Sequence, residues 1–225
     1  MFNVDGIIKA LQSDKAMQKN VMSGAAGMAA GMLLSGGGLG KMVGSLAKAG
    51  AVAAVGGLAW SAWQTYQKNQ PGAPASSEDA FVPPPQASYQ REELGKSLVR
   101  AMIAAAKADG QIDAEEKSRI FQRLESMPLS AEEKAFVFDE LSSPLDIEAV
   151  VARADTPEHA SEIYAASLVA MKPDTPTERA YLDALAFKLK LAPALVAEIH
   201  RTAGLETSTP PMATNANTYA PTGNV

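Results

Sequence analysis

The sequence predicts an all-α protein, in which a compact bundle of about seven short helices follows an apolar, glycine-rich segment and a proline-rich linker. Three observations lead to this prediction. Alanine is plentiful while only 6% of the residues are aromatic, a composition that favours close-packed helices. No stretch shows the sustained alternation of β-branched and polar residues that a strand requires. Helix-capping residues recur through the second half of the chain.

The first 68 residues are expected to associate with a membrane. Residues 1–20 predict a short amphipathic helix with lysines on one side, and residues 21–40 carry no charge and are long enough to span a bilayer. Small residues spaced four apart let helix backbones approach closely in lipid, which predicts self-association of residues 21–68. These positions are Gly27, Gly31, Gly36, Gly40 and Gly44.

A second apolar run, from Ala49 to Trp63, ends in aromatic residues. Trp60 and Trp63, followed by Lys68, have the pattern of an aromatic anchor at a membrane interface. Three arrangements remain open. The segment forms a helical hairpin in the bilayer, a single span centred on residues 43–63, or a glycine zipper outside the membrane.

The charge of the chain is divided unevenly. Residues 1–70 hold six lysines and two acidic residues and so carry +4, which leaves −9 of the net charge of −5 for the remainder. A basic apolar segment joined to an acidic domain favours a partner membrane for the first part. The acidic domain has the wrong sign to neutralise phosphates, so nucleic acid is not an expected partner.

Beyond residue 68 the chain divides into three parts. Residues 69–90, rich in proline and serine, predict an extended, semi-rigid tether. Residues 91–203 predict the helical domain, with an apolar stripe that begins at Leu94, Leu98 and Met102. Residues 204–225, rich in serine, threonine, proline and asparagine, are expected to be disordered.

The stretch from Ala108 to Glu116 is the first of two acidic corners between helices. Gly110 can end one helix, and Asp113 is a suitable N-cap for the next, with Glu116 as its capping-box partner. The stretch also matches the second half of an EF-hand calcium loop. The first half fails, because Ala105 and Lys107 stand where acidic ligands are needed. A capped turn and a cation site therefore both remain possible.

The second acidic corner follows another alanine-rich helix. Thr175 is a natural N-cap, Pro176 occupies the first helical position and Glu178 closes a capping box. If the two halves of the domain pack about a pseudo-twofold axis, the corners would bring their carboxylates together. Such oxygen ligands suit calcium or magnesium, and zinc less well. The candidate metal ligands are Asp109, Asp113, Glu116, Asp174 and Glu178.

Residues 98–200 resemble a TerB-type domain, named after tellurite-resistance proteins. The resemblance rests on the motif at residues 106–116 and on the later Asp174 and Glu178. With the glycine-rich N-terminal part, the chain resembles the uncharacterised YebE-like family of bacterial inner membrane proteins. The resemblance implies an all-α fold whose two acidic corners share one surface proposed to bind metal. It also implies a link to tellurite or envelope stress. Lysines on both sides of the apolar segment favour a cytoplasmic position for the C-terminal domain, because positive charges flank membrane segments on that side.

The sequence does not predict an enzyme. Cysteine is absent, which excludes disulfides, thiolate zinc sites and a cysteine nucleophile, and no phosphate-binding, dinucleotide-binding or serine-hydrolase motif occurs. The two histidines, His159 and His200, are expected at exposed helix ends. The expected function is a membrane-anchored protein whose acidic domain binds a divalent cation or a protein partner. The alternative is an oligomeric membrane scaffold in which the acidic residues only cap helices.

Overall fold

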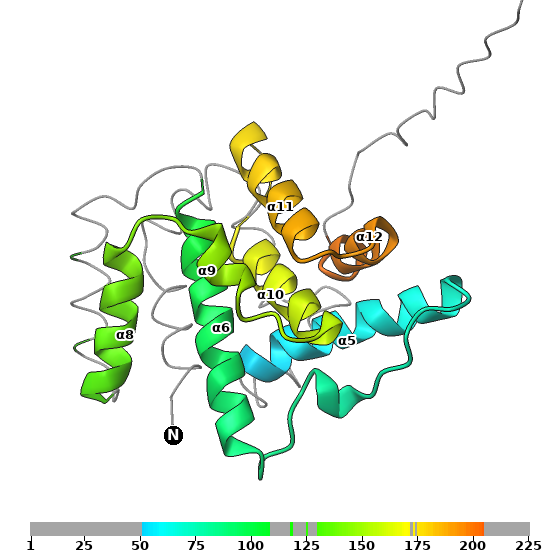
Figure 1. Cartoon of the computed structure of the whole chain (residues 1–225), viewed down its shortest axis with the longest axis horizontal. Coiled ribbons are helices and arrows are strands. Elements are labelled where there is room, and N and C mark those ends of the chain that lie inside the picture. Colours follow the sequence, from blue (N-terminus) through cyan, green and yellow to red (C-terminus); the bar gives the residue numbers. More distant parts are fainter. Residues whose placement is uncertain are drawn as a thin grey trace, which may run out of the picture.

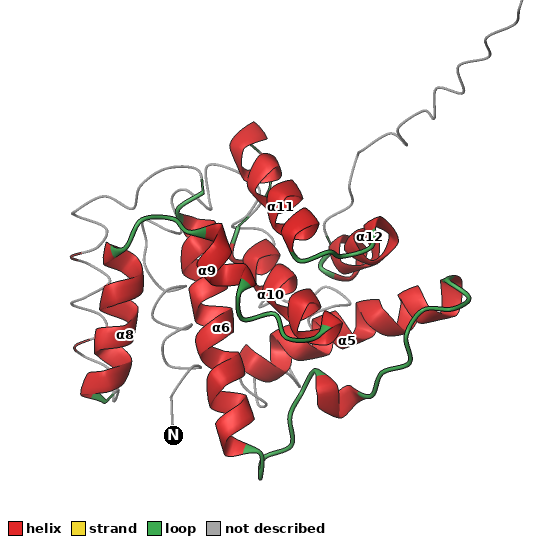
Figure 2. Cartoon of the chain, viewed as in Figure 1, coloured by secondary structure: helices red, strands yellow, loops and turns green. Residues whose placement is uncertain are grey.

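The structure is a computed structural model that describes residues 51–108, 118, 125, 130–171, 173 and 175–204. Every regular element in this described part is helical, and the predicted all-α fold is confirmed (Figure 2). The α-helices are α5 (Ala51–Asn69), α6 (Ser88–Ala106), α8 (Ala131–Ser142), α9 (Ile147–Val151), α10 (Pro157–Ala170), α11 (Pro176–Lys188) and α12 (Pro193–Thr202), and a 3-10 helix, η1 (Glu78–Ala80), lies between α5 and α6.

Helix α10 is the central element of the bundle (Figure 1). It packs along α6 on one side and against α5 on another, while α12 packs on α5 and α8 lies on the outer side of α6. Nine consecutive residues of α10, from Ala160 to Leu168, are buried. Small side chains such as Ala165 and Ala166 let the neighbouring helices approach α10 closely, which explains how one helix can be covered on nearly all sides.

Short-range capping signals in the sequence are reproduced by the structure. The hydroxyls of Ser130 and Thr175 accept hydrogen bonds from the backbone N–H groups of Glu133 and Glu178, and each glutamate bonds back to the backbone of its cap residue. The capping box predicted at Thr175 is thus present, and the one predicted at Asp113 lies outside the described residues. The boxes at Ser130 and Thr175 satisfy backbone donors that the first turn of a helix otherwise leaves free.

The apolar stripe of α6 was predicted correctly. Leu94, Leu98 and Met102 are all buried, and Leu98 is fully enclosed. In α8, one large apolar side chain, Phe138, is half exposed. Val137 and Leu141, four residues apart, occupy the inward face of α8 and so turn Phe138 towards solvent.

Helix α5 belongs to the core of the bundle. Ala59 and Ala62 are fully buried, and Trp63 is 2% exposed with its ring 5.6 Å from that of Phe81. The hydrophobic core therefore crosses the expected domain boundary at residue 90, and Trp63 lies inside the protein rather than at an exposed helix end. The physical reason is that a helix of alanine, glycine and valine suits a protein interior as well as it suits lipid.

The proline-rich connection between α5 and α6 is folded onto the bundle rather than extended away from it. Phe81 is fully buried and its ring packs between Trp60, at 5.5 Å, and Trp63. Arg91 donates a hydrogen bond from Nη1 to the carbonyl oxygen of Pro83 at 3.0 Å. One buried aromatic side chain is enough to turn a segment with the composition of a tether into part of the core.

Candidate functional site

The predicted metal ligands can be followed only in part. Asp109, Asp113, Glu116 and Asp174 lie outside the described residues. Glu178 is described: it is 8% exposed, and its Oε2 accepts a hydrogen bond from the backbone N–H of Thr175 at 2.9 Å. Within the ranges that the structure describes, no group of three or more histidine, aspartate or glutamate side chains is placed to hold a metal ion. The cation site at the two corners stays a prediction.

The predicted membrane and self-association residues are divided in the same way. Gly27, Gly31, Gly36, Gly40 and Gly44 lie outside the described residues, as do residues 1–20 and 205–225. Trp60 and Trp63 are described and pack on Phe81 within the bundle. Among the helices of the described part, none combines the length and the apolar character needed to cross a bilayer.

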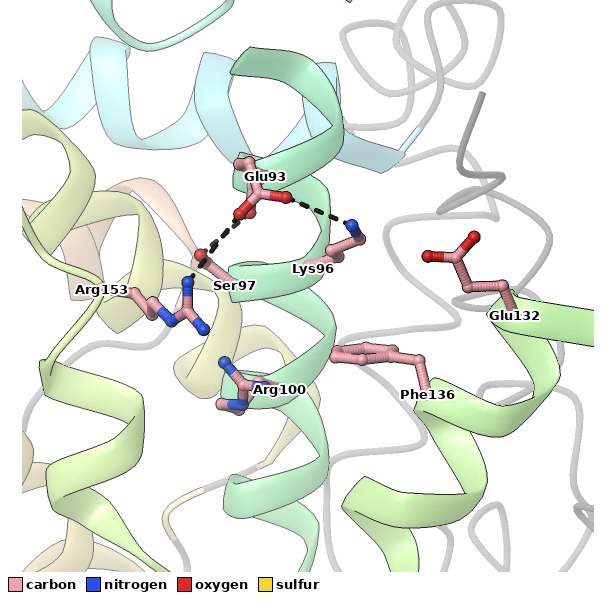
Figure 3. Close-up of a pocket in the computed structure, with 7 residues that line it drawn as sticks. All are labelled: Glu93, Lys96, Ser97, Arg100, Glu132, Phe136 and Arg153. Carbon is pink, nitrogen blue, oxygen red and sulfur yellow. Dashed lines mark hydrogen bonds and ion pairs between the residues drawn. The ribbon is translucent and has the colours of Figure 1, made fainter. Parts of the chain in front are cut away.

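A charged pocket opens between α6, α8 and the turn after α9 (Figure 3). It has a volume of about 270 Å³ and brings together side chains from three separate stretches of the chain. Acidic and basic groups alternate around it, and one aromatic ring from α8 points towards α6 (Figure 3). The lining residues are Glu93, Lys96, Ser97, Arg100, Glu132, Phe136 and Arg153.

Two cations of the pocket are held by ion pairs. Lys96 Nζ lies 3.0 Å from Glu92 and 3.2 Å from Glu93, and hydrogen bonding to Glu92 raises the pKa of Lys96 despite some desolvation. Arg100 Nε donates to Glu140 Oε1 at 2.7 Å, and its guanidinium lies 5.5 Å from the centre of the Phe136 ring. These contacts fix the side of α6 that faces α8.

A buried lysine joins α6 to the end of α8. Lys107 is 8% exposed, and its ammonium donates to the carbonyl oxygens of Glu140 and Ser143. The C-terminal carbonyls of a helix have no partners within the helix and carry a partial negative charge. Lys107 therefore holds α8, and with it Phe136, in place against α6.

Arg153 is the cation that the pocket holds least tightly. Its Nη1 lies 3.8 Å from Glu93 Oε2, beyond hydrogen-bond distance, and its side chain is 53% exposed. A guanidinium with donors turned towards solvent suits a carboxylate, which it can hold through two parallel hydrogen bonds. Arg153 stands at the mouth of the pocket, across α6 from Phe136 (Figure 3).

The two histidines lie deeper than the sequence predicted. His200 is 8% exposed and lies 2.8 Å from the Tyr164 hydroxyl, and His159 is half-buried. Desolvation lowers the pKa of both imidazoles. The expectation of exposed histidines was wrong for His200, because α12 turns its last turn onto α10 and encloses the ring.

Helix α10 also carries a carboxyl group in the core. Glu162 is 1% exposed, and its Oε1 makes no hydrogen bond with the described residues. Desolvation, with a smaller contribution from the negative charge of Glu158, raises the pKa of Glu162 well above its usual value. Neither Glu162 nor the pocket was predicted from the sequence. A glutamate at one α10 position among alanine, isoleucine and tyrosine was the available signal for Glu162.

Comparison with known proteins identifies a family but assigns no activity. The DUF533 family, described as a protein of unknown function, matches residues 18–203. A protein of Yersinia enterocolitica, described as "Uncharacterized protein in ampR 5'region", is 33% identical over 94 residues, which are 42% of this chain and 68% of that protein. No solved structure matches significantly. Since the family match spans α5 to α12 together with part of the glycine-rich segment, the chain belongs to the DUF533 family, a TerB-like family.

Proposed function

We propose that this protein is a non-enzymatic binding protein of the bacterial inner membrane. In this proposal the helical bundle receives an acidic segment of a partner protein, and the glycine-rich residues before α5 attach the bundle to the membrane. The observation that carries the proposal is the pocket between α6 and α8, which the half-exposed Arg153 and the Phe136 ring both line.

The size and lining of the pocket favour a protein segment over a small substrate. Its volume of about 270 Å³ is below the 300–1,000 Å³ range of most small-molecule sites and accommodates one or two side chains. Arginine and aromatic residues are enriched where protein interfaces hold their anchor residues. A carboxylate bound by Arg153 beside an apolar side chain on Phe136 satisfies both features.

The place of α5 supports the attachment to a membrane. The glycine-rich segment leads directly into α5, and α5 is buried in the core through residues such as Ala59 and Trp63. Since residues 21–50 directly precede α5 in the sequence, a membrane contact made by them would keep the bundle close to the bilayer. The inner membrane and a role in tellurite or envelope stress follow the family resemblance, the cytoplasmic position of the bundle follows the lysines on both sides of the apolar segment, and all three are part of the proposal.

The partner site is tested by crosslinking in cells. A photo-reactive amino acid replaces Phe136 in the full chain, and a second version carries it at Phe187, which is 85% exposed on α11. We expect a defined adduct from position 136 and none from 187. A synthetic peptide with the acidic segment of the crosslinked protein should then bind the purified full chain.

Charge reversal supplies the control for this experiment. Arg153→Glu should abolish the adduct, because it places a carboxylate where the partner's carboxylate binds. Arg201→Glu reverses an arginine of similar exposure, 64%, that is paired within α12, and should leave the adduct unchanged. An adduct at position 136 that persists in Arg153→Glu would refute the proposed role of the pocket.

Cation binding at the acidic corners is proposed as a second function. Glu178 supports this function because the capping box holds its carboxylate at the second corner, where one oxygen accepts a hydrogen bond from the backbone N–H of Thr175. Calcium or magnesium is titrated into the full chain while amide NMR signals are followed. Shifts are expected around residues 109–116 and 174–178.

Substitutions at the two capping boxes distinguish ligation from folding. Glutamine can replace glutamate in a capping box, so Glu178→Gln keeps the helix start but removes the charge. It should weaken the cation-induced shifts, and Asp113→Asn should abolish them. Glu133→Gln makes the same change at the other box and should leave them intact. Absence of shifts at millimolar metal would reduce the acidic residues to helix caps.

A further inference from the structure

The connection between α5 and α6 meets α10 at one glycine. A Cβ atom added to Gly56 would lie 2.4 Å from the carbonyl oxygen of Phe81, 3.0 Å from Val82 Cγ2 and 3.1 Å from Glu162 Oε1. The backbone of the connection and the Glu162 carboxyl therefore approach the same point on α5. We refer to Gly56, Phe81 and Glu162 together as the Glu162 contact.

Both oxygens at the Glu162 contact are buried, and the described residues give neither of them a hydrogen-bond donor. Phe81 is fully buried, and no backbone N–H of the described residues donates to its carbonyl oxygen. Glu162 Oε1 is also buried, and it accepts no hydrogen bond from the described residues. A carbonyl and an ionised carboxylate are both acceptors only, so neither can satisfy the other. A buried acceptor without a partner destabilises the folded state.

A protonated carboxyl group resolves this conflict, because it supplies one O–H donor. We propose that Glu162 is a neutral carboxylic acid in the folded protein and donates to the Phe81 carbonyl, so that the α5–α6 connection is held on the bundle in a proton-dependent way. Loss of the proton removes the donor and leaves a buried anion beside a carbonyl oxygen. The connection then loses its attachment to α10, and α5 loses the cover that Phe81 gives to Trp63.

The charges around the Glu162 contact do not favour the ionised form. Helix α5 brings no charged residue before Lys68, and η1 brings the acidic Glu78 and Asp79. On α10, Glu158 carries a negative charge that acts on Glu162, and His159 lies close in sequence with its own pKa lowered. Charged groups on the other helices packed against α10 form ion pairs of their own: Lys96 with Glu92 and Glu93, Arg100 with Glu140, Glu148 with Lys188, and Glu198 with Arg201. His200 is hydrogen-bonded to Tyr164, and the negative charge of Asp183 acts on its imidazole.

The direction of the pH dependence follows from burial. Desolvation raises the pKa of Glu162 well above the value of 4.5 that is usual for glutamate. The folded protein therefore holds this proton more tightly than the unfolded chain does. The stabilisation is complete below pH 4.5 and is lost as the pH rises through the folded-state pKa.

Amide hydrogen exchange of the full chain, measured from about pH 5 to about pH 9, tests the proposal. The amides of Phe81 and Val82 both bond to Glu78 O, at 2.9 and 2.8 Å, and report on the connection. Between pH 4.5 and the folded-state pKa, their protection factors in the wild type should fall by up to about tenfold per pH unit, and above that pKa they should level off. Glu162→Gln retains a donor and cannot ionise, so its protection factors should stay constant.

Two further measurements complete the test. Glu158→Gln removes the neighbouring negative charge and so lowers the folded-state pKa of Glu162; the fall in protection should remain but level off at a lower pH. The ¹³C shift of the Glu162 carboxyl carbon in the wild type reports protonation directly and does not depend on any variant folding. Parallel exchange profiles for wild type and Glu162→Gln, or a Glu162 carboxyl that titrates near the usual value, would overturn the proposal.

Discussion

Helix α10 and helix α8 are attached to the same bundle by different kinds of contact. Helix α10 meets α5 and α6 through a dry surface of alanine and larger apolar side chains, with Ala165, Ala166 and Ile163 all fully buried. Helix α8 buries Val137 and Leu141 but is otherwise fixed to α6 by charged groups, with Arg100 bound to Glu140 and Lys107 bound to two carbonyls.

This difference indicates which parts of the protein tolerate substitution. A close-packed apolar contact loses free energy with every atom removed, because the cavity left behind is only partly filled. A contact made by a few charged groups contributes less stability where water still reaches them, as at the partly exposed pair of Arg100 and Glu140. Helix α8 and the turn after α9 can therefore vary to suit a partner, whereas the α5–α10 contact determines whether the bundle folds.

The largest effect should come from Trp63→Ala on the dry side. The substitution removes a side chain that is 2% exposed and should lower the free energy of unfolding by about 3–5 kcal/mol. Chemical denaturation of the full chain measures it. Trp60→Ala is the matched control and should cost less, because Trp60 is only partly buried. If Trp63→Ala weakens membrane association but leaves unfolding unchanged, Trp63 acts as an interfacial anchor and the comparison fails.

An intermediate effect is expected for Lys107→Met on the charged side. Methionine fills similar space but cannot donate to the Glu140 and Ser143 carbonyls, which should cost about 1–3 kcal/mol. The loss should be local, so hydrogen exchange should accelerate in α8 and much less in α10. Uniform acceleration in both helices would show that α8 is not a separable part of the bundle.

The smallest effect on folding is expected for Arg153→Glu. The side chain is half exposed and its contact with Glu93 is 3.8 Å, so the unfolding free energy should change by no more than about 0.5 kcal/mol. The denaturation midpoint measures this change. A much larger shift would mean that Arg153 supports the fold, and loss of partner binding in this variant would then carry no information about the pocket.

Prediction from sequence succeeded where the signal is local. A capping box needs two residues three positions apart, so Ser130 with Glu133 and Thr175 with Glu178 can be recognised without knowing the fold. The α6 stripe of Leu94, Leu98 and Met102 follows from helical periodicity in the same way.

Prediction fell short where residues distant in sequence meet. Nothing near Phe81 indicates that its ring will pack on Trp60 and Trp63, some twenty positions earlier, because the pairing depends on the path of the chain between them. The pocket has the same origin, since Arg153 and Phe136 both line it only through the packing of α9 and α8 on α6. His200 was misplaced because the packing of α12 decides its burial.

The amino-acid sequence alone was enough to predict that this protein is helical. It also indicated where several of the helices begin and which of their faces are apolar. These properties follow from hydrogen bonds and side-chain periodicity within a few residues. The packed structure was needed to show that α5 is a core helix, that the proline-rich connection is folded onto it, and that the Phe81 carbonyl oxygen and Glu162 Oε1 both lie close to Gly56. The hydrophobic effect favours burial without specifying a partner. An apolar helix can therefore be expected to be buried, but only the packed structure shows which elements cover it.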